Sequence, residues 1–277
     1  MSKPTPEEKQ GPMSKLGVVK AMQAAAFAKD WALFKSYFAD QVYYRVGNVT
    51  EVKGPEAVAS YLRDLPSKGL TITRMDVRGA WETAAVAIAE YTMGGTRGDG
   101  RAAEYPCVDI YRFEGDKFID WRVYAIEPIF VSDPGAVTLK RPTTESQAPG
   151  GTPTDSQRIV NTFQMALRDG DEATALSLLT GDAVVKVGDH PEVKSPHSIL
   201  EHVQEIFSKR LKPTGAEPLD VWEFDGVMLV EMIVQASRVR DGRAVEYPCV
   251  ETYRFADGKI REWRIYPIVT TLLASEG

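Results

Sequence analysis

Residues 104–126 read EYPCVDIYRFEGDKFIDWRVYAI, and residues 246–268 read EYPCVETYRFADGKIREWRIYPI. The two stretches are 142 positions apart and share 13 of 23 residues. Self-similarity at about 140 residues is too long a period for a solenoid and indicates a duplicated domain. A chain of 277 residues also exceeds what one hydrophobic core usually organises. The sequence therefore predicts two copies of one domain in tandem.

Each copy is expected to contain three helices and a meander of long strands. In the first copy, helical periodicity covers 14–28 and 30–38, a short β-branched run covers 41–47, and a third helix starts at Gly54-Pro55. Strand-like runs follow at 70–80, 83–94, 102–113 and 117–128, and their counterparts are 216–224, 227–238, 244–255 and 259–270. This order is typical of an α+β fold with a mostly antiparallel sheet.

Composition sets the domain boundaries. The polar segment 1–12 is expected to be a disordered tail, and 13–131 to be the first domain. The segment 132–154 is rich in Pro, Gly, Ser and Thr and is expected to be a linker. The second domain then covers 155–274.

The charge pattern excludes several classes of partner. The net charge is −6, and Lys and Arg are scattered among acids, so the sequence predicts no nucleic-acid partner. No apolar stretch is long enough for a membrane span and no signal peptide is visible, so we expect a cytoplasmic protein with no membrane partner. No ligand cluster has metal spacing, so neither a metal nor an organic cofactor is expected.

The two cysteines, Cys107 and Cys249, occupy equivalent positions in the repeat. If each side chain points into its own domain, the sulfur atoms cannot come within bonding distance. We interpret them as buried thiols.

Both copies resemble the nuclear transport factor 2-like superfamily. The resemblance is carried by the order of elements, by a helix start after GNVTEVKGPEAV (47–58), and by final strands of the form GDKFIDWRVY (115–124) and DGKIREWRIY (257–266). Members include polyketide cyclases of the SnoaL type, ketosteroid isomerase, scytalone dehydratase and limonene epoxide hydrolase. The resemblance implies two cone-shaped α+β barrels, each a curved sheet packed around three helices, with a pocket in the open end.

Strand alternation predicts which side chains face that pocket. Residues i, i+2 and i+4 share one face of a strand. The concave set in 105–113 is Tyr105, Cys107, Asp109, Tyr111 and Phe113. By aligning the two copies, we also expect Tyr44, Val46, Glu90, Thr92, Val123 and Ala125 to face inward, against Val185, Val187, Met232, Val234, Ile265 and Pro267 in the second copy. A slip of one residue would reverse the faces and leave Glu90 outside.

A repeated acid, Asp109 and Glu251, carries the functional hypothesis. A carboxyl among Tyr, Phe and Val side chains is desolvated, and its pKa rises toward neutrality. Asp109 would then transfer a proton to or from a small hydrophobic, aromatic substrate. Tyr44 or Tyr105 would donate a hydrogen bond to a developing oxyanion, and Glu90 is a second candidate acid or base. The substrate-binding candidates are Thr92, Val46, Trp31, Tyr111, Val123, Tyr247 and Glu251.

Departures from the resembling enzymes keep alternatives open. Limonene epoxide hydrolase has an aspartate after its Trp-Arg pair, where this chain has Val123 and Ile265. Ketosteroid isomerase has its general base on the first strand, where this chain has Val46 and Val187. The reaction could therefore be that of a lyase, isomerase, dehydratase, cyclase or epoxide hydrolase. Alternatively, the chain is a non-catalytic binding module and its paired acids are structural.

The outer face of the repeated strand is too apolar for water. It carries Val108, Ile110 and Arg112 in the first copy and Val250, Thr252 and Arg254 in the second. We expect the two copies to pack on each other through it as an intrachain pseudo-dimer. Assembly of chains into a homo-oligomer is left open.

Overall fold

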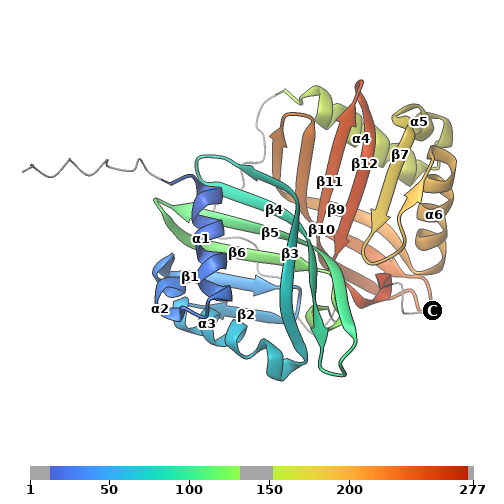
Figure 1. Ribbon diagram of the computed structural model, residues 1–277. Helices are drawn as coiled ribbons and strands as arrows, with labels where there is room; N and C mark the ends of the chain where they lie inside the picture. The colour runs from blue at the N-terminus through green and yellow to red at the C-terminus, as the bar shows by residue number, and fades with distance from the viewer. Residues whose placement is uncertain (1–12, 132–151, 274–277) are drawn as a thin grey trace, which may run out of the picture.

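The structure, a computed structural model, describes residues 13–131 and 152–273. Two six-stranded sheets meet in the middle of the molecule, and each carries its helices on the side away from the other sheet (Figure 1). The two-domain α+β prediction is confirmed. The predicted tail at 1–12 and most of the predicted linker lie outside the described residues.

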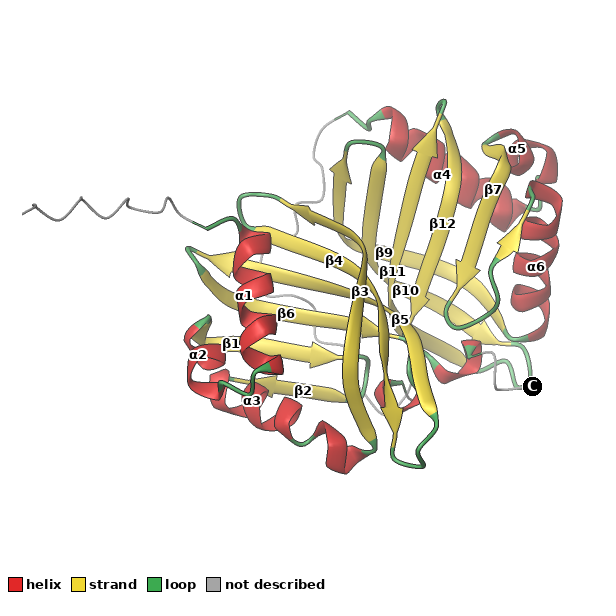
Figure 2. Ribbon diagram, viewed as in Figure 1, coloured by secondary structure: helices red, strands yellow, loops and turns green. Residues whose placement is uncertain are grey.

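Each half has the same succession of elements (Figure 2). The first half contains α1 (Lys15–Phe27), α2 (Trp31–Ser36), β1 (Phe38–Val46), β2 (Thr50–Lys53), α3 (Pro55–Arg63), the 3₁₀ turn η1 (Leu65–Lys68), β3 (Leu70–Glu82), β4 (Val86–Arg97), β5 (Ala102–Glu114), β6 (Lys117–Ala125) and η2 (Pro128–Phe130). The second half contains α4 (Asp155–Asp169), α5 (Glu172–Ser177), β7 (Leu179–Val187), β8 (Val193–Lys194), α6 (Pro196–Lys209), β9 (Leu211–Phe224), β10 (Val227–Arg238), β11 (Ala244–Ala256), β12 (Lys259–Pro267) and η3 (Thr270–Leu272).

The sheets are curved but open. Their strand orders are β2-β1-β6-β5-β4-β3 and β8-β7-β12-β11-β10-β9, and only the β1–β6 and β7–β12 pairs are parallel. The edge strands of each sheet do not pair with each other, so each cone is formed by an open, curved sheet. The short edge strands β2 and β8 were missed, since so few residues show no clear alternation.

Local sequence starts the first two helices. The Ser14 side chain accepts a hydrogen bond from the Gly17 amide, and the Asp30 side chain accepts one from the Leu33 amide, both at 3.0 Å. Each satisfies an amide that has no partner within its helix. The α1 helix thereby runs along the concave side of the first sheet, where its buried side chains enter the core.

Equivalent residues of the two halves are not separated by the same number of positions throughout. Four residues separate β4 from β5, whereas five separate β10 from β11. Asp109 lies opposite Ala89, and Glu251 lies opposite Val230. The residue equivalent to Glu90 is therefore Glu231, and the alignment that matched Glu90 with Met232 is wrong by one position.

The sheets pack through an apolar cluster drawn from both halves. Val108 and Ile110 of β5 contact this cluster together with Val250 of β11, and all three are fully buried. Trp81 and Phe224 stack across it with ring centroids 6.0 Å apart. The expected intrachain pseudo-dimer is confirmed.

Two buried carboxylates bind arginines across this interface. Glu231 accepts hydrogen bonds from Arg122 at 2.7 Å, Arg112 at 2.9 Å and the Tyr124 hydroxyl at 2.5 Å, all from the first half. Arg45 lies 3.9 Å from the same carboxylate. Burial alone would raise the pKa of Glu231, but the arginine charges outweigh it and hold the pKa below its usual range.

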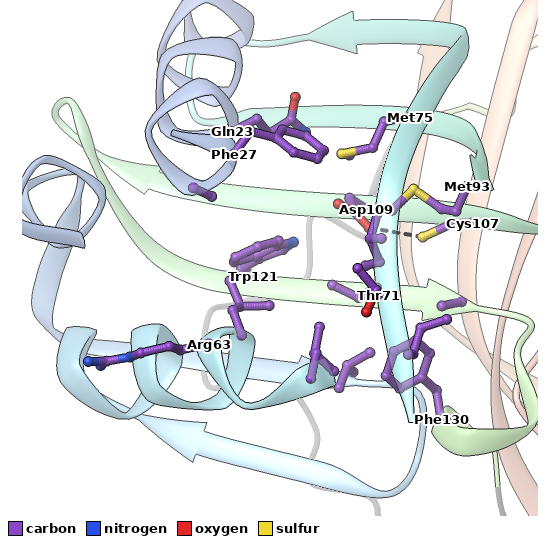
Figure 3. A pocket seen from close by; sticks show the side chains of 18 of the residues that line it. Gln23, Phe27, Arg63, Thr71, Met75, Met93, Cys107, Asp109, Trp121 and Phe130 are labelled. Atoms are coloured by element: carbon purple, nitrogen blue, oxygen red, sulfur yellow. Dashed lines mark hydrogen bonds between the residues drawn. The ribbon is translucent and has the colours of Figure 1, made fainter. Parts of the chain in front are cut away.

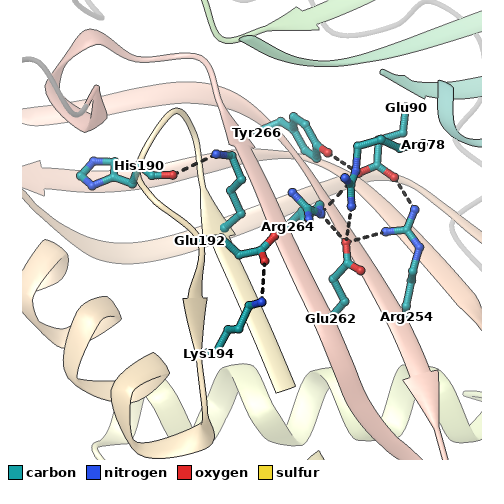
Figure 4. A network of polar contacts seen from close by, with 10 residues as sticks. Arg78, Glu90, His190, Glu192, Lys194, Arg254, Glu262, Arg264 and Tyr266 are labelled. Atoms are coloured by element: carbon teal, nitrogen blue, oxygen red, sulfur yellow. Dashed lines mark hydrogen bonds and ion pairs between the residues drawn. The ribbon is translucent and has the colours of Figure 1, made fainter. Parts of the chain in front are cut away.

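Glu90 makes the reciprocal set of contacts to the second half (Figure 4). Its carboxylate accepts hydrogen bonds from Arg254 and from the Tyr266 hydroxyl, and Arg264 lies 3.7 Å away. Arg78 of the same half lies 3.5 Å away. Glu90 is therefore an interface residue, and the prediction that it faces the pocket is wrong.

The Glu231→Gln variant should be strongly destabilised. The change removes one charge from a buried cluster and leaves arginines uncompensated, which typically costs about 3–5 kcal/mol. Urea unfolding would measure the loss. Glu56→Gln, which removes an exposed carboxylate paired with Lys35, is the matched control and should change stability little. Equal losses in the two variants would show that the apolar cluster alone holds the sheets together.

Candidate active site

The first half encloses a cavity of about 390 Å³ between its helices and the concave face of its sheet. Its wall is mostly apolar and comes from α1, α2, α3, η1, η2 and strands β1 and β3–β6. Among its lining residues, the charged ones are Lys29, Arg63 and Asp109. A small, largely apolar molecule fits such a space.

Asp109 is the buried acid of this cavity (Figure 3). It lies in the middle of β5, which the packed helices cover. The Tyr111 hydroxyl donates to its Oδ2 at 2.6 Å, and the Cys107 Sγ donates to its Oδ1 at 3.2 Å. Desolvation outweighs these bonds and raises the pKa of Asp109 to about 6.

Two buried donors on the same wall have no hydrogen-bond partner among the described residues. They are the Tyr105 hydroxyl and the Trp121 indole N–H. The indole group is near enough to Asp109 to lower the pKa of its carboxyl. A buried polar group without a partner is costly, so a ligand oxygen that accepts from either donor would relieve that cost.

The structure brings most of the predicted pocket residues together. Tyr44, Val46, Trp31 and Val123 line the cavity with Tyr105 and Asp109. Tyr44 packs edge-on against Trp121, with ring centroids 4.8 Å apart. The placements of the strand residues follow from alternation, as expected, whereas Trp31 reaches the cavity from α2.

Two predicted pocket residues, Glu90 and Thr92, lie outside the cavity, and a third, Tyr111, lies behind its wall. Glu90 and Thr92 share the outward face of β4, and Tyr91 and Met93 take the inward face. The prediction that Thr92 binds substrate is therefore wrong in its geometry, for the same reason as for Glu90. Tyr111 does not line the cavity; it stands behind Asp109 and supports its carboxylate.

Several residues of the cavity and its support were not predicted from the sequence. The Gln23 amide donates to the hydroxyls of Tyr91 at 2.8 Å and Tyr111 at 3.3 Å, so it braces the support of Asp109. Phe27 and Met75 line the cavity from α1 and β3. Helical periodicity could have placed Gln23 near the core face, but no motif marked it.

Phe130 closes one side of the cavity from η2. Its backbone carbonyl accepts a hydrogen bond from the Asn48 amide at 3.1 Å. Gly47 has φ +56°, and a Cβ there would lie 1.7 Å from the same carbonyl oxygen. Only glycine therefore allows the β1–β2 turn to approach Phe130 this closely.

The second half repeats the acid but uses its neighbours differently. Glu251 accepts hydrogen bonds from Trp263 Nε1 and from the Gln164 amide, both at 3.0 Å, and from the Tyr253 hydroxyl. Burial outweighs these bonds and raises the pKa of Glu251 to about 7. Tyr247 belongs to the core of this half. Glu251 and Tyr247 therefore lie apart from the first cavity, in the equivalent place of their own domain.

No cluster of three or more His, Cys, Asp or Glu residues that could hold a metal occurs in the described residues. Among the same residues, no helix is both long and apolar enough to cross a membrane. Both cysteines are buried free thiols, as predicted.

Comparison with protein families matches residues 19–121 and 159–263 to the SnoaL-like domain. The chain belongs to the SnoaL-like domain family. Each matched stretch is one of the two halves described above, so the family is present twice. Among curated proteins, no sequence matches this chain significantly.

Solved structures resemble one half at a time. A nuclear transport factor 2-like protein from Burkholderia xenovorans LB400 is 17% identical, covers 44% of this chain and 96% of its own, and has a TM-score of 0.39. An epoxide hydrolase from M. tuberculosis, similar to limonene epoxide hydrolase, is 18% identical, covers 43% and 86%, and has a TM-score of 0.36. A cystatin-fold protein from Novosphingobium aromaticivorans is 24% identical, covers 40% and 98%, and has a TM-score of 0.35.

Asp109→Asn should make the protein more stable at neutral pH. The folded protein keeps the Asp109 proton up to about pH 6, whereas the unfolded chain loses it near pH 4. The folded state binds more protons between these values, so this carboxyl's contribution to stability falls as pH rises through that window. The variant has nothing to ionise and should gain about 2 kcal/mol on wild type between pH 4 and pH 7.5.

Urea unfolding at the two pH values measures this difference. Asp225→Asn, in the exposed β9–β10 turn, is the control and should show no comparable change. A stability difference between Asp109→Asn and wild type that is the same at both pH values would mean that Asp109 titrates as an ordinary exposed carboxyl.

Proposed function

We propose that the chain is a cofactor-independent enzyme that transfers a proton to or from a small apolar, aromatic substrate in the first cavity. The observation that carries the proposal is the Asp109 carboxyl, buried in the wall of an apolar cavity with its pKa raised to about 6. Buried acids with shifted pKa values in pockets are frequent at catalytic sites.

Asp109 would act as the general base. With its pKa at about 6 it is deprotonated at pH 7, yet it is a stronger base than an exposed aspartate. The Tyr111 hydroxyl and the Cys107 thiol fix the orientation of the carboxylate. Gln23 holds Tyr111 in turn, so a substrate would meet a base that is already positioned.

The unpartnered donors would stabilise the charge that develops on the substrate. The Tyr105 hydroxyl and the Trp121 N–H line the same cavity as the base, and neither makes a well-formed hydrogen bond with another described residue. A substrate oxygen near them would gain negative charge as Asp109 removes a proton, and fixed donors in a dry site stabilise such charge strongly. Tyr44 is a further donor from β1.

The cavity wall favours a planar hydrophobic substrate. Phe27, Trp31, Phe130 and Met75 supply aromatic and thioether surface around a space of about 390 Å³. Lyase, isomerase, dehydratase, cyclase and epoxide-opening reactions on such substrates share one proton transfer in a water-poor pocket. The proposal covers that shared step.

The second half would be a structural partner. In the first half the Trp121 N–H lies near Asp109 without a well-formed hydrogen bond to it, whereas in the second the equivalent Trp263 donates to the acid at 3.0 Å. Glu251 therefore has three donors within its own domain, and a substrate would have to displace them.

Hydrogen–deuterium exchange into a probe tests proton transfer without knowledge of the natural substrate. We expect the wild-type protein to accelerate exchange of the acidic C–H of 2-tetralone in D₂O, followed by NMR. Asp109→Asn should lower the protein-dependent rate at least about 100-fold. The rate should also fall as the pH drops below about 6, because Asp109 is then protonated. Glu251→Gln is the matched control and should retain exchange.

The alternative is a binding module without chemistry. It is favoured by the apolar Val46 and Val123, which stand where enzymes of this superfamily carry acids. In that case 2-tetralone would bind with no accelerated exchange. Equal rates in wild type and Asp109→Asn would contradict the assignment of the base.

A further inference from the structure

The two halves end their first helix in the same way, so the residues that follow it can be compared one by one. After α1, the Asp30 amide donates to the Ala25 carbonyl at 2.9 Å. After α4, the Asp171 amide donates to the Ala166 carbonyl at the same distance. Lys29 and Gly170, the residues just before these aspartates, are therefore equivalent.

Lys29 occupies a backbone conformation that favours glycine. Its φ is +59°, and that of Gly170 is +74°. A helix that ends with a left-handed residue usually has glycine there, because a Cβ is strained in that conformation. The second half has the unstrained residue, and the first places an exposed lysine in the lining of the cavity. Strain of this kind persists most often at functional sites.

A second exposed cation lines the same cavity. Arg63, at the end of α3, lines the cavity and lies over the Trp31 ring with its guanidinium carbon 5.6 Å from the ring centroid. The equivalent pair in the second half is Gln204 and Glu172, joined by a hydrogen bond of 3.0 Å. Figure 3 shows the Arg63 guanidinium directed outward, away from Asp109.

The exposed charged residues of the lining are therefore the cations Lys29 and Arg63, while the buried one is Asp109. Among the nearby acids, Asp30 caps α2, and Glu56 pairs with both Lys35 and Arg63, so it balances part of the Arg63 charge. In a chain with a net charge of −6, the lining of this cavity nevertheless carries two cations against one acid.

We propose that Lys29 and Arg63 bind an anionic group, of the carboxylate class, at one end of the substrate. This inference rests on the proposed function and specifies its substrate: an aromatic body with a carboxylate that stays at the mouth. Repulsion from the Asp109 carboxylate keeps that group out of the inner cavity. The uncharged end of the substrate is thereby directed toward the base.

A pair of probes that differ only in charge tests the proposal. The probes are 2-naphthylacetate and its neutral amide, 2-naphthylacetamide, with binding measured by calorimetry at pH 8, where Asp109 is ionised. We expect the wild-type protein to bind the acid about five- to tenfold more tightly than the amide. Exposed ion pairs of this kind are each worth a few-fold in affinity.

Each variant replaces a residue of the first half with its equivalent in the second half. Lys29→Gly and Arg63→Gln should each weaken acid binding about threefold and leave amide binding unchanged. Lys29→Gly should also raise the melting temperature by about 2 °C, because it relieves the backbone strain. Lys20→Ala, which removes an exposed cation of α1 that does not line the cavity, is the control and should change neither affinity.

The outcomes separate this inference from the proposed function. If the amide binds and the acid has no advantage, or if Lys29→Gly weakens both probes equally, the anion site is wrong and the proposed function stands. If neither probe binds, the cavity does not accept an aromatic body, and both proposals fail.

Discussion

Glu90 and Glu231 each leave their own sheet and enter a cluster of arginines on the other half. A buried carboxylate without a cation would be expensive, and so would the arginines without it. Each half therefore completes the charge balance of the other, while the apolar cluster around Val108 and Val250 excludes water. The two domains therefore depend on this contact, because neither face could remain in solvent.

The site depends on that contact through the alternation of β5. Asp109 points to the helices, while Val108 and Ile110, its two neighbours, point to the other half. Packing on the outer face thus fixes the strand that carries the acid on the inner face. The Asp109 support from Tyr111 belongs to the same strand, so the orientation of the carboxylate is set by the sheet and not by a loop.

The residues whose position depends on local periodicity could be placed correctly from the sequence. Asp109 and Tyr44 were placed correctly because alternation along one strand is sufficient to assign them. Glu90 was placed wrongly because one extra residue in a hairpin reverses the faces of the preceding strand relative to the repeat. Phe130 could not be predicted, since its position depends on the approach of a distant turn at Gly47. Whether each sheet closes into a barrel or stays open could not be predicted either, because this depends on strand curvature.

The presence of both copies in one chain has a consequence for how they can change. In a dimer of identical chains, any substitution appears at two places at once. A strained residue at a pocket rim would therefore lower the stability of both copies. Here Lys29 and Gly170 occupy equivalent places independently. Covalent linkage releases the two pockets from symmetry, so that one copy can keep the better-folding residue while the other specialises.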